Sequence, residues 1–168
     1  MRAGGGPGVN TILLEHKTIL PVPGSKSILL AIGNESRGDD GLGQAFAGRI
    51  SGRLPQHWTV EHRYQLMVED AEFLTGFDHV VFVDASAQAL PGGFVLERCA
   101  PDPGASLYTH QQTPGAILHL CQSLYEHRPD AWCLGIQGYA WELGTEVCPA
   151  ARENLERAVT AFALWVAA

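Results

Sequence analysis

Acidic and imidazole side chains follow or flank the segments of this sequence that look like buried strands. Asp40 lies in a glycine-rich loop after the apolar run 28–32, and Asp84 directly follows the apolar run 80–83. His110 stands just before a predicted helix. Because the carboxyl ends of parallel strands gather at one edge of a sheet, we expect Asp40, Asp84 and His110 to meet there. Two carboxylates and an imidazole form a ligand set that suits zinc or nickel and leaves room for water or a substrate group.

Each of these residues also has an interpretation without chemistry. Asp39 and Asp40 precede a predicted helix, and aspartate is a favoured N-cap residue. Asp84 could cap a turn, and a lone His110 could be a solvated loop residue. The place of His110 ahead of a helix N-terminus favours the neutral imidazole, which is the form that binds a metal.

Other motifs with known chemistry do not fit this sequence. The glycines of residues 33–38 lack the Lys-Ser/Thr pair of a phosphate-binding loop, and their spacing is not GxGxxG. No GxSxG nucleophile elbow is present. The four cysteines lie far apart without a CxxC pair, which predicts small buried side chains in a reducing compartment rather than a zinc or redox motif.

Alternating strand-like and helix-like segments predict an α/β fold. The predicted strands cover residues 28–32, 59–63, 80–83, 94–98 and 132–137, with a further extended piece at 106–109. The predicted helices begin near Leu42, Val68, Thr113 and Pro149. Strands that alternate with helices form a mostly parallel sheet covered on both faces, so we expect a single-domain, three-layer α/β/α sandwich.

The helix at Thr113 has the clearest boundaries. Thr113 is a favoured N-cap residue, and Pro114 fits the first helical turn. Helical spacing predicts a core face formed by Ile117, Leu118, Cys121, Leu124 and Tyr125.

The composition is that of one globular domain with an acidic surface. The chain has 168 residues, of which 46% are hydrophobic, and a formal net charge of -7. An acidic chain repels phosphate backbones and anionic lipid, and no apolar run approaches the ~20 residues of a membrane span. We therefore expect a cytoplasmic protein that binds neither nucleic acid nor membranes. Residues 1–25 form a predicted loosely ordered extension, and residues 26–168 form the domain.

Four segments together resemble the NiFe hydrogenase maturation endopeptidases, in the order in which that family has them. They are a glycine-rich signature loop, an apolar strand ending in Asp-Ala, a His-Gln pair before a helix, and a closing strand and helix. The matching residues are Ile32-Gly33-Asn34 with Arg37-Gly38-Asp39-Asp40-Gly41-Leu42-Gly43, Val81-Phe82-Val83-Asp84-Ala85, His110-Gln111, and Leu134-Gly135-Ile136-Gln137 with Cys148-Pro149.

The resemblance implies an enzyme that removes a short C-terminal extension from a hydrogenase large-subunit precursor after nickel insertion. It implies metal contacts from Asp40, Asp84 and His110, with Asp40 and Asp84 also as the catalytic carboxylates. The nickel would belong to the precursor, so the isolated protein can be metal-free, and zinc or cadmium could occupy the site in crystals. The residues expected to support the site are Gly33, Asn34, Arg37, Gly38, Asp39, Gly41 and Gln111. Among them Asp39 is expected to anchor the loop and cap the helix.

The resemblance leaves the chemistry open between a metal-activated water and a carboxylate that acts as general base. Residues 64–72 are similar to the branch that processes soluble, cytoplasmic hydrogenases. Two other classes of function use the same three residues. One is a small-molecule metallohydrolase with its own divalent metal, and the other is a nickel-sensing chaperone without catalysis.

Overall fold

The computed structural model describes residues 24–105 and 112–167 of the chain. His110, Gln111 and the extended piece predicted at 106–109 lie outside the described residues, as do residues 1–23 of the predicted extension.

Strands and helices alternate along the described part of the chain, as predicted. The strands are β1 (Ser27–Ile32), β2 (Trp58–Arg63), β3 (His79–Ser86), β4 (Phe94–Arg98) and β5 (Asp130–Gln137). The α-helices are α1 (Leu42–Ile50), α2 (Asp70–Phe73), α3 (Pro114–Tyr125) and α4 (Pro149–Ala167). Short 3-10 turns cover Gly38–Gly41, Ser51–Arg53, Leu74–Gly76 and Pro91–Gly93.

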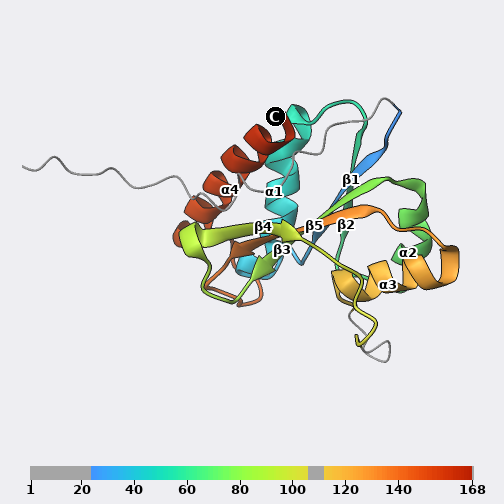
Figure 1. The fold of residues 1–168 in the computed structure, drawn as a ribbon. Helices are drawn as coiled ribbons and strands as arrows, with labels where there is room; N and C mark the ends of the chain where they lie inside the picture. The colour runs from blue at the N-terminus through green and yellow to red at the C-terminus, as the bar shows by residue number, and fades with distance from the viewer. Residues whose placement is uncertain (1–23, 106–111, 168) are drawn as a thin grey trace, which may run out of the picture.

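The strands form one sheet in the order β2-β1-β3-β5-β4. Strands β1, β2, β3 and β5 pair in parallel, and only the edge strand β4 pairs antiparallel, with β5. Helices α1 and α4 cover one face of the sheet, and α2 and α3 cover the other (Figure 1). The predicted three-layer α/β/α sandwich with a mostly parallel sheet is confirmed.

Strand β1 shows why its sequence is apolar throughout. All six residues of Ser27–Ile32 are buried. Leu29 and Ala31 belong to the core under α1 and α4, whereas Ile28, Leu30 and Ile32 belong to the core under α2 and α3. A strand with a helix layer on both faces needs apolar side chains at every position, because successive side chains point to opposite faces.

Helix α3 confirms one prediction and corrects another. The Thr113 hydroxyl accepts a hydrogen bond from the Ala116 amide at 3.2 Å, so Thr113 is the N-cap as predicted. Leu124 and Tyr125, however, are 65% and 43% exposed, and their assignment to the core face was wrong. A helical stripe in the sequence gives the direction of the apolar face but not the point at which the neighbouring layer ends.

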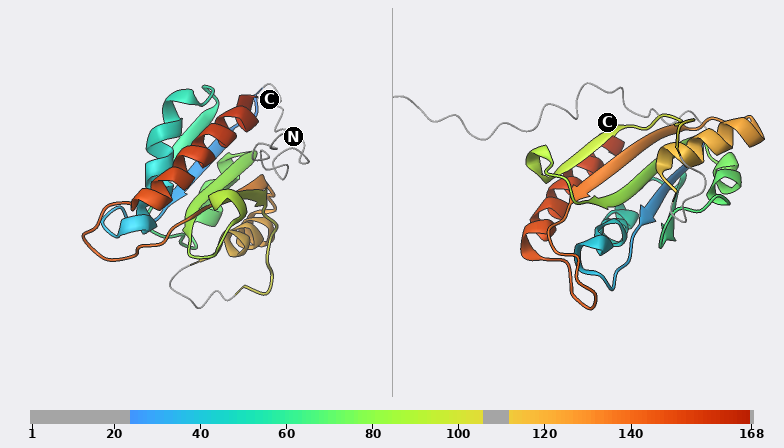
Figure 2. Two further views of the ribbon diagram at one scale, coloured as in Figure 1. Left: turned by 90° about the vertical axis from the view of Figure 1, so that its left-hand side faces the viewer. Right: turned by 90° about the horizontal axis from the view of Figure 1, so that it is seen from below.

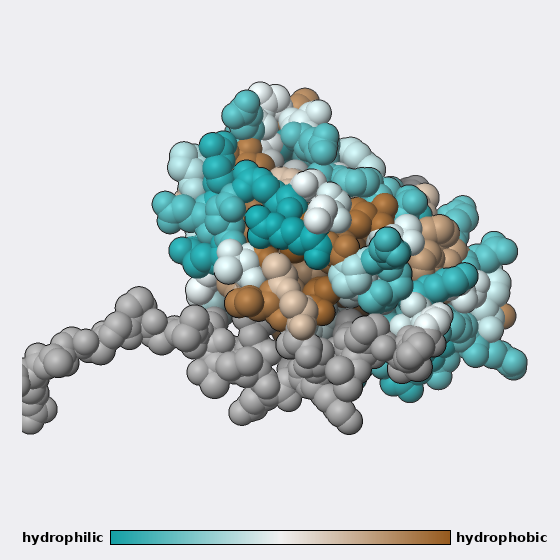
Figure 3. Space-filling view, turned by 90° about the horizontal axis from the view of Figure 1, so that it is seen from above, coloured by the Kyte–Doolittle hydropathy of each residue, from teal (hydrophilic) through white to brown (hydrophobic). Residues whose placement is uncertain are grey.

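The prediction for the cysteines was also only partly right. Cys121 is buried, whereas Cys99, Cys133 and Cys148 are half-buried. On the face drawn in Figure 3, hydrophilic residues surround a smaller hydrophobic area. No helix within the described residues is long and apolar enough to span a membrane.

Candidate active site at the carboxyl edge of the sheet

The sheet has its topological switch point between β1 and β3. From β1 the chain crosses to β2 on one side, and it then returns to β3 on the other side of β1. At such a point the connections leave in opposite directions and open a crevice outside the carboxyl ends of the strands, where ligands bind in open α/β sheets. Asp40 follows β1, and Asp84 lies near the end of β3. The structure therefore places both predicted acids at this switch point.

Glycine at two positions brings the Asp40 loop close to the strand ends. A Cβ on Gly43 would lie 2.2 Å from the Ile32 carbonyl oxygen and 2.7 Å from that of Val83. The start of α1 thus packs directly on the ends of both β1 and β3. A Cβ on Gly33, which has a φ of +131°, would lie 1.9 Å from the Asp40 carbonyl oxygen. Any side chain at either position would push the loop away from the sheet.

The Asp40 carboxylate is oriented by the turn that follows β1. Its Oδ2 accepts a hydrogen bond from the Asn34 amide at 3.0 Å. The Asn34 side chain in turn accepts from the Ser36 amide at 2.9 Å and donates to the Tyr64 hydroxyl at 3.2 Å. Asn34 therefore links the end of β1, the residue after β2 and the candidate ligand Asp40.

Asp84 has the most perturbed carboxyl group of the site. The pKa of Asp84 is raised to about 7, mainly by burial. The Ala85 amide, which donates to Oδ1 at 2.8 Å, acts to lower the pKa, and the negative charge of Asp40 acts to raise it. The repulsion shows that the two acids lie close enough to interact. The prediction that β3 ends at Asp84 was wrong, because the strand continues to Ser86 and holds Asp84 in rigid, paired backbone.

Asp39, the neighbour of Asp40, is fully buried, and its side chain contacts the loop between β5 and α4. Its carboxylate accepts hydrogen bonds from the amides of Tyr139, Ala140 and Cys148 at 2.6, 2.9 and 2.7 Å, and from the Cys148 thiol at 3.2 Å. These hydrogen bonds lower the pKa of Asp39, although its burial acts in the opposite direction as the largest single influence. Asp39 thus clamps the loop between β5 and α4 against the loop that carries Asp40. The ribbon of Figure 2 shows these two loops at the same end of the molecule.

Further contacts complete this clamp. The Arg37 guanidinium donates to the Trp141 carbonyl oxygen at 3.0 Å, and the Gly38 amide donates to the Thr145 carbonyl oxygen at 3.0 Å. Gly38 has a φ of +55°, and a Cβ there would lie 2.6 Å from the Ala140 carbonyl oxygen. The expected loop-anchoring role of Asp39 therefore agrees with the structure, but the capping role does not, since no side chain caps α1.

The donor set fits a divalent cation as far as the described residues reach. Two neighbouring carboxylates at a switch point repel each other, and a cation between them would relieve that repulsion. Within the described residues, no group of three or more His, Cys, Asp or Glu side chains is arranged to hold a metal ion. His110 and Gln111 lie outside them, so the three-residue ligand set remains a prediction.

Several residues around the site were missed from the sequence. Gln44 is buried and donates to the carbonyl oxygens of Ala31, Gly33 and Arg63. Asp70 is buried in an ion pair with Arg63. No sequence pattern indicated Gln44, because at helical spacing it lies on the side of α1 opposite Leu42 and Phe46, where a polar residue is expected to face solvent.

A separate surface depression of about 560 Å³ lies at the opposite, amino end of the sheet. It is lined by Gly24, Ser25, Asp78, His79, His127, Arg128 and Asp130. Its position behind the amino ends of β1, β3 and β5 separates it from Asp40 and Asp84. Because open α/β sheets bind ligands at the carboxyl ends of their strands, we assign the candidate site to Asp40 and Asp84.

Comparisons with known proteins find the same architecture. No protein-family model and no curated protein matches the sequence. Among solved structures, the chain is similar to the NiFe hydrogenase maturation protease HycI from Thermococcus kodakarensis, with a TM-score of 0.66 and 22% identity over 86% of this chain and 94% of that one. It is also similar to the hydrogenase maturating endopeptidase HybD from E. coli, with a TM-score of 0.64 and 19% identity over 82% and 89% of the two chains.

A third similar structure is a hydrogenase 3 maturation protease, with a TM-score of 0.59 and 21% identity over 83% of this chain and 90% of that one. In all three comparisons the alignment spans most of both chains, so the similarity concerns the whole domain and not one motif. The chain therefore has the fold of the NiFe hydrogenase maturation proteases.

Proposed function

We propose that this protein is an endopeptidase that removes the C-terminal extension of a NiFe hydrogenase large-subunit precursor after nickel insertion. The observation that carries the proposal is the pair Asp40 and Asp84 at the switch point of a sheet whose fold is that of the maturation proteases. The resemblance of the signature loop and of the Asp-Ala strand end points to the same family. We place the reaction in the cytoplasm, where the acidic and cysteine-containing chain is expected.

The site residues divide into two roles in this proposal. Asp40 and Asp84, together with His110, contact the nickel that the precursor carries. The loop residues Gly33, Asn34, Arg37, Gly38, Asp39 and Gly41, and Gln111 beside His110, hold these ligands in place. The hydrogen bond from the Asn34 amide to Asp40 and the clamp formed by Asp39 support this division for the described residues.

Asp84 is suited to move a proton during peptide hydrolysis. A carboxyl group with a pKa of about 7 is present in both its ionised and its protonated form at neutral pH. As a carboxylate it can take a proton from the attacking water, and as an acid it can return that proton to the leaving amine. The nickel of the substrate would orient the cleaved segment against Asp84 and Asp40.

The test is the mass of the precursor. Purified protein is incubated with nickel-loaded precursor, and intact-mass spectrometry follows the C-terminus. We expect loss of the extension with the wild type and with Asp130→Asn, an exposed control at the amino end of β5, but at least about a hundredfold slower loss with Asp40→Asn, Asp84→Asn or His110→Ala. Unimpaired processing by a variant that combines Asp40→Asn, Asp84→Asn and His110→Ala would refute the proposal.

The same experiment separates the two alternative functions. A nickel-sensing chaperone would form a complex with the precursor without changing its mass. A small-molecule metallohydrolase would carry stoichiometric metal after purification and would ignore the precursor. Precursors of soluble and of membrane-linked hydrogenases, compared side by side, test the resemblance of residues 64–72 to the branch that serves soluble enzymes.

A further inference from the structure

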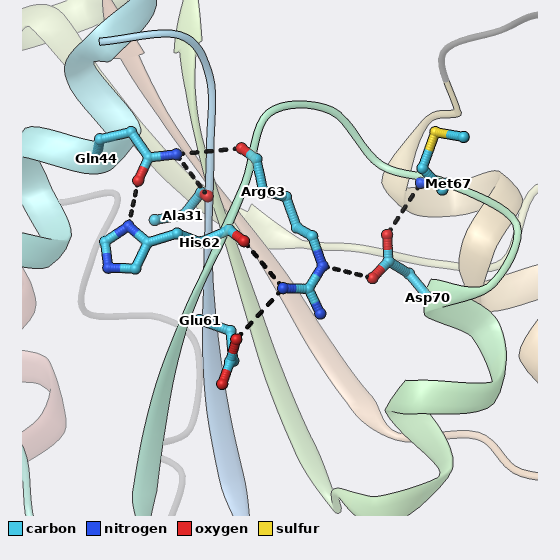
Figure 4. A network of polar contacts seen from close by, with 7 residues as sticks. All are labelled: Ala31, Gln44, Glu61, His62, Arg63, Met67 and Asp70. Carbon is cyan, nitrogen blue, oxygen red and sulfur yellow. Dashed lines mark hydrogen bonds and ion pairs between the residues drawn. The ribbon is translucent and has the colours of Figure 1, made fainter.

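A polar network lies at the carboxyl ends of β1 and β2 beside the candidate site, and it contains none of the proposed ligands (Figure 4). At its centre the Arg63 Nε donates to the Asp70 Oδ1 at 2.8 Å. The side chain of Asp70 is only 6% exposed. Its second oxygen, Oδ2, accepts a hydrogen bond from the Met67 amide at 2.9 Å. Both oxygens of this buried carboxylate are therefore committed.

The Arg63 guanidinium is held from several directions. It donates to the His62 carbonyl oxygen at 2.9 Å, and its central carbon lies 4.9 Å from the centre of the Phe73 ring. Because Arg63 contacts a carboxylate, a backbone carbonyl and an aromatic ring at once, the Arg63–Asp70 pair has one favoured geometry. The pair thus fixes residues 64–69 between the end of β2 and the start of α2.

The backbone of this segment holds the turn that orients Asp40. The Arg63 carbonyl oxygen accepts from the Gly33 amide at 3.0 Å, and the Tyr64 hydroxyl accepts from the Asn34 side chain at 3.2 Å. The Asn34 amide then donates to Asp40 Oδ2 at 3.0 Å. An unbroken chain of contacts therefore runs from Asp70 to the carboxylate of Asp40.

Gln44 joins the same network from α1. Its side-chain amide donates to the carbonyl oxygens of Ala31, Gly33 and Arg63 at 3.3, 3.2 and 3.1 Å, and its oxygen contacts the His62 ring. The end of β1, the end of β2 and the start of α1 are thereby tied together. A shift of the Arg63 backbone would be transmitted to the Gly33 turn, because the carbonyl oxygens of Arg63 and Gly33 both accept from the buried side-chain amide of Gln44.

A second arginine–aspartate pair shows what is unusual about the first. Arg98 and Asp130 have the same chemistry and a similar distance of 2.9 Å, but their side chains are 51% and 57% exposed at the amino end of β5. An exposed pair contributes little to stability, whereas a buried pair is costly to desolvate and is retained in some proteins because it fixes one geometry.

We propose that Asp70 is a positioning residue of the active site, which acts through Arg63 and the Gly33–Asn34 turn to orient the Asp40 carboxylate. This inference rests on the proposed function for its catalytic readout. Without the Asp70 charge, Arg63 keeps only the longer contact of its Nη1 with Glu61 Oε2 at 3.4 Å as an acidic partner, and the Met67 amide loses its acceptor. The segment carrying Tyr64 then loosens, and Asn34 and Asp40 lose their fixed orientation.

The test compares Asp70→Asn with the matched control Asp130→Asn. Asparagine has no charge and replaces one of the two acceptor oxygens with an NH2 donor, which would face either Arg63 or the Met67 amide, both of which are donors. We expect Asp70→Asn to lower kcat for precursor cleavage by about tenfold with KM within about threefold, since misplacement of a catalytic group acts on the chemical step. Asp130→Asn should leave both parameters within about twofold of the wild type. A wild-type kcat in Asp70→Asn would overturn the inference.

Two further measurements keep the test decisive. If Asp70→Asn unfolds at the assay temperature, the double variant Arg63→Met/Asp70→Leu replaces the pair with apolar side chains that a buried position tolerates. A stable double variant that cleaves slowly supports the inference, and one that cleaves at the wild-type rate refutes it.

If the wild type itself does not cleave the precursor, the proposed function fails, and NMR still decides the positioning role. The side-chain carboxyl ¹³C shift of Asp40 reports its hydrogen bond to Asn34 without any substrate. That shift should move in Asp70→Asn and stay unchanged in Asp130→Asn. An unmoved shift in Asp70→Asn would refute the positioning role by itself.

Discussion

Asp84 couples the stability of the protein to pH. Its pKa of about 7 in the folded state lies above the ordinary aspartate value of 3.8. Between these two pH values the folded state therefore binds more protons than the unfolded chain, and the free energy of unfolding falls as pH rises. The cause is the cost of a buried negative charge beside that of Asp40. In the proposed function, the carboxylate of Asp84 would contact the nickel of the precursor, which explains why an acid stands at this costly position.

Replacement of Asp84 by asparagine should remove this pH dependence. We expect the free energy of unfolding of Asp84→Asn, measured relative to the wild type, to increase by about 4 kcal/mol between pH 4 and pH 8. Urea denaturation at both pH values measures the difference. Asp130→Asn, whose carboxylate is exposed, should follow the wild type at both. A constant difference between Asp84→Asn and the wild type would mean that the Asp84 pKa is ordinary.

Helix α1 owes its position at the site to the absence of a side chain at one residue. Gly43 lets the first turn of α1 rest on the carbonyl groups that end β1 and precede Asp84. The same helix contains Gly48, which is exposed and has open space where a methyl group would lie. The close contact at position 43 therefore requires a glycine, whereas position 48 has room for a larger side chain, although both residues lie in α1.

Alanine at these two glycines should have opposite effects. Gly43→Ala places a methyl group against two backbone oxygens, and we expect a loss of about 2 kcal/mol or more in the free energy of unfolding and a strong loss of processing. Gly48→Ala should raise the free energy of unfolding by about 0.5–1 kcal/mol, because alanine is the better helix former. Thermal unfolding of both variants and precursor cleavage measure the effects. Equal behaviour of the two variants would contradict the close contact at Gly43.

At the scale of the whole molecule, the candidate site joins elements that are distant in the sequence. The loop before α1 carries Asp40, β3 carries Asp84, and the loop before α4 is clamped by Asp39. A ligand that bridges Asp40 and Asp84 binds the folded chain and not the unfolded one. It should therefore stabilise the entire domain.

Nickel added to the isolated protein should raise its unfolding midpoint. At a concentration about 100 times the Kd, one bound ion adds about 2.7 kcal/mol, which corresponds to roughly 5–10 °C for a domain of this size. Differential scanning calorimetry with and without Ni²⁺ measures the shift. It should vanish in Asp40→Asn and in Asp84→Asn and persist in Asp130→Asn. A shift that survives both site variants would place the ion elsewhere.

The sequence alone determined the class of fold and the location of the two acids at strand ends. Apolar runs without polar interruption require helices on both faces of the sheet, and parallel strands bring their carboxyl ends to one edge. The prediction of Asp40 and Asp84 at that edge depended only on these general constraints and on the family resemblance. His110 stays a prediction, since it lies outside the described residues.

The family resemblance implied different roles for Asp39 and Asp40, but only the tertiary structure gave the physical reason for the difference. The two residues are adjacent and chemically identical, but one accepts four hydrogen bonds from the loop before α4 and the other faces Asn34 and Asp84. The partners of Asp39 lie about 100 residues further along the chain, at 139–148, and no local pattern announces them. The same reason applies to Asp70 and Gln44, because hydrogen bonds and buried charges depend on which segments the fold brings together, whereas apolar periodicity is written in each segment by itself.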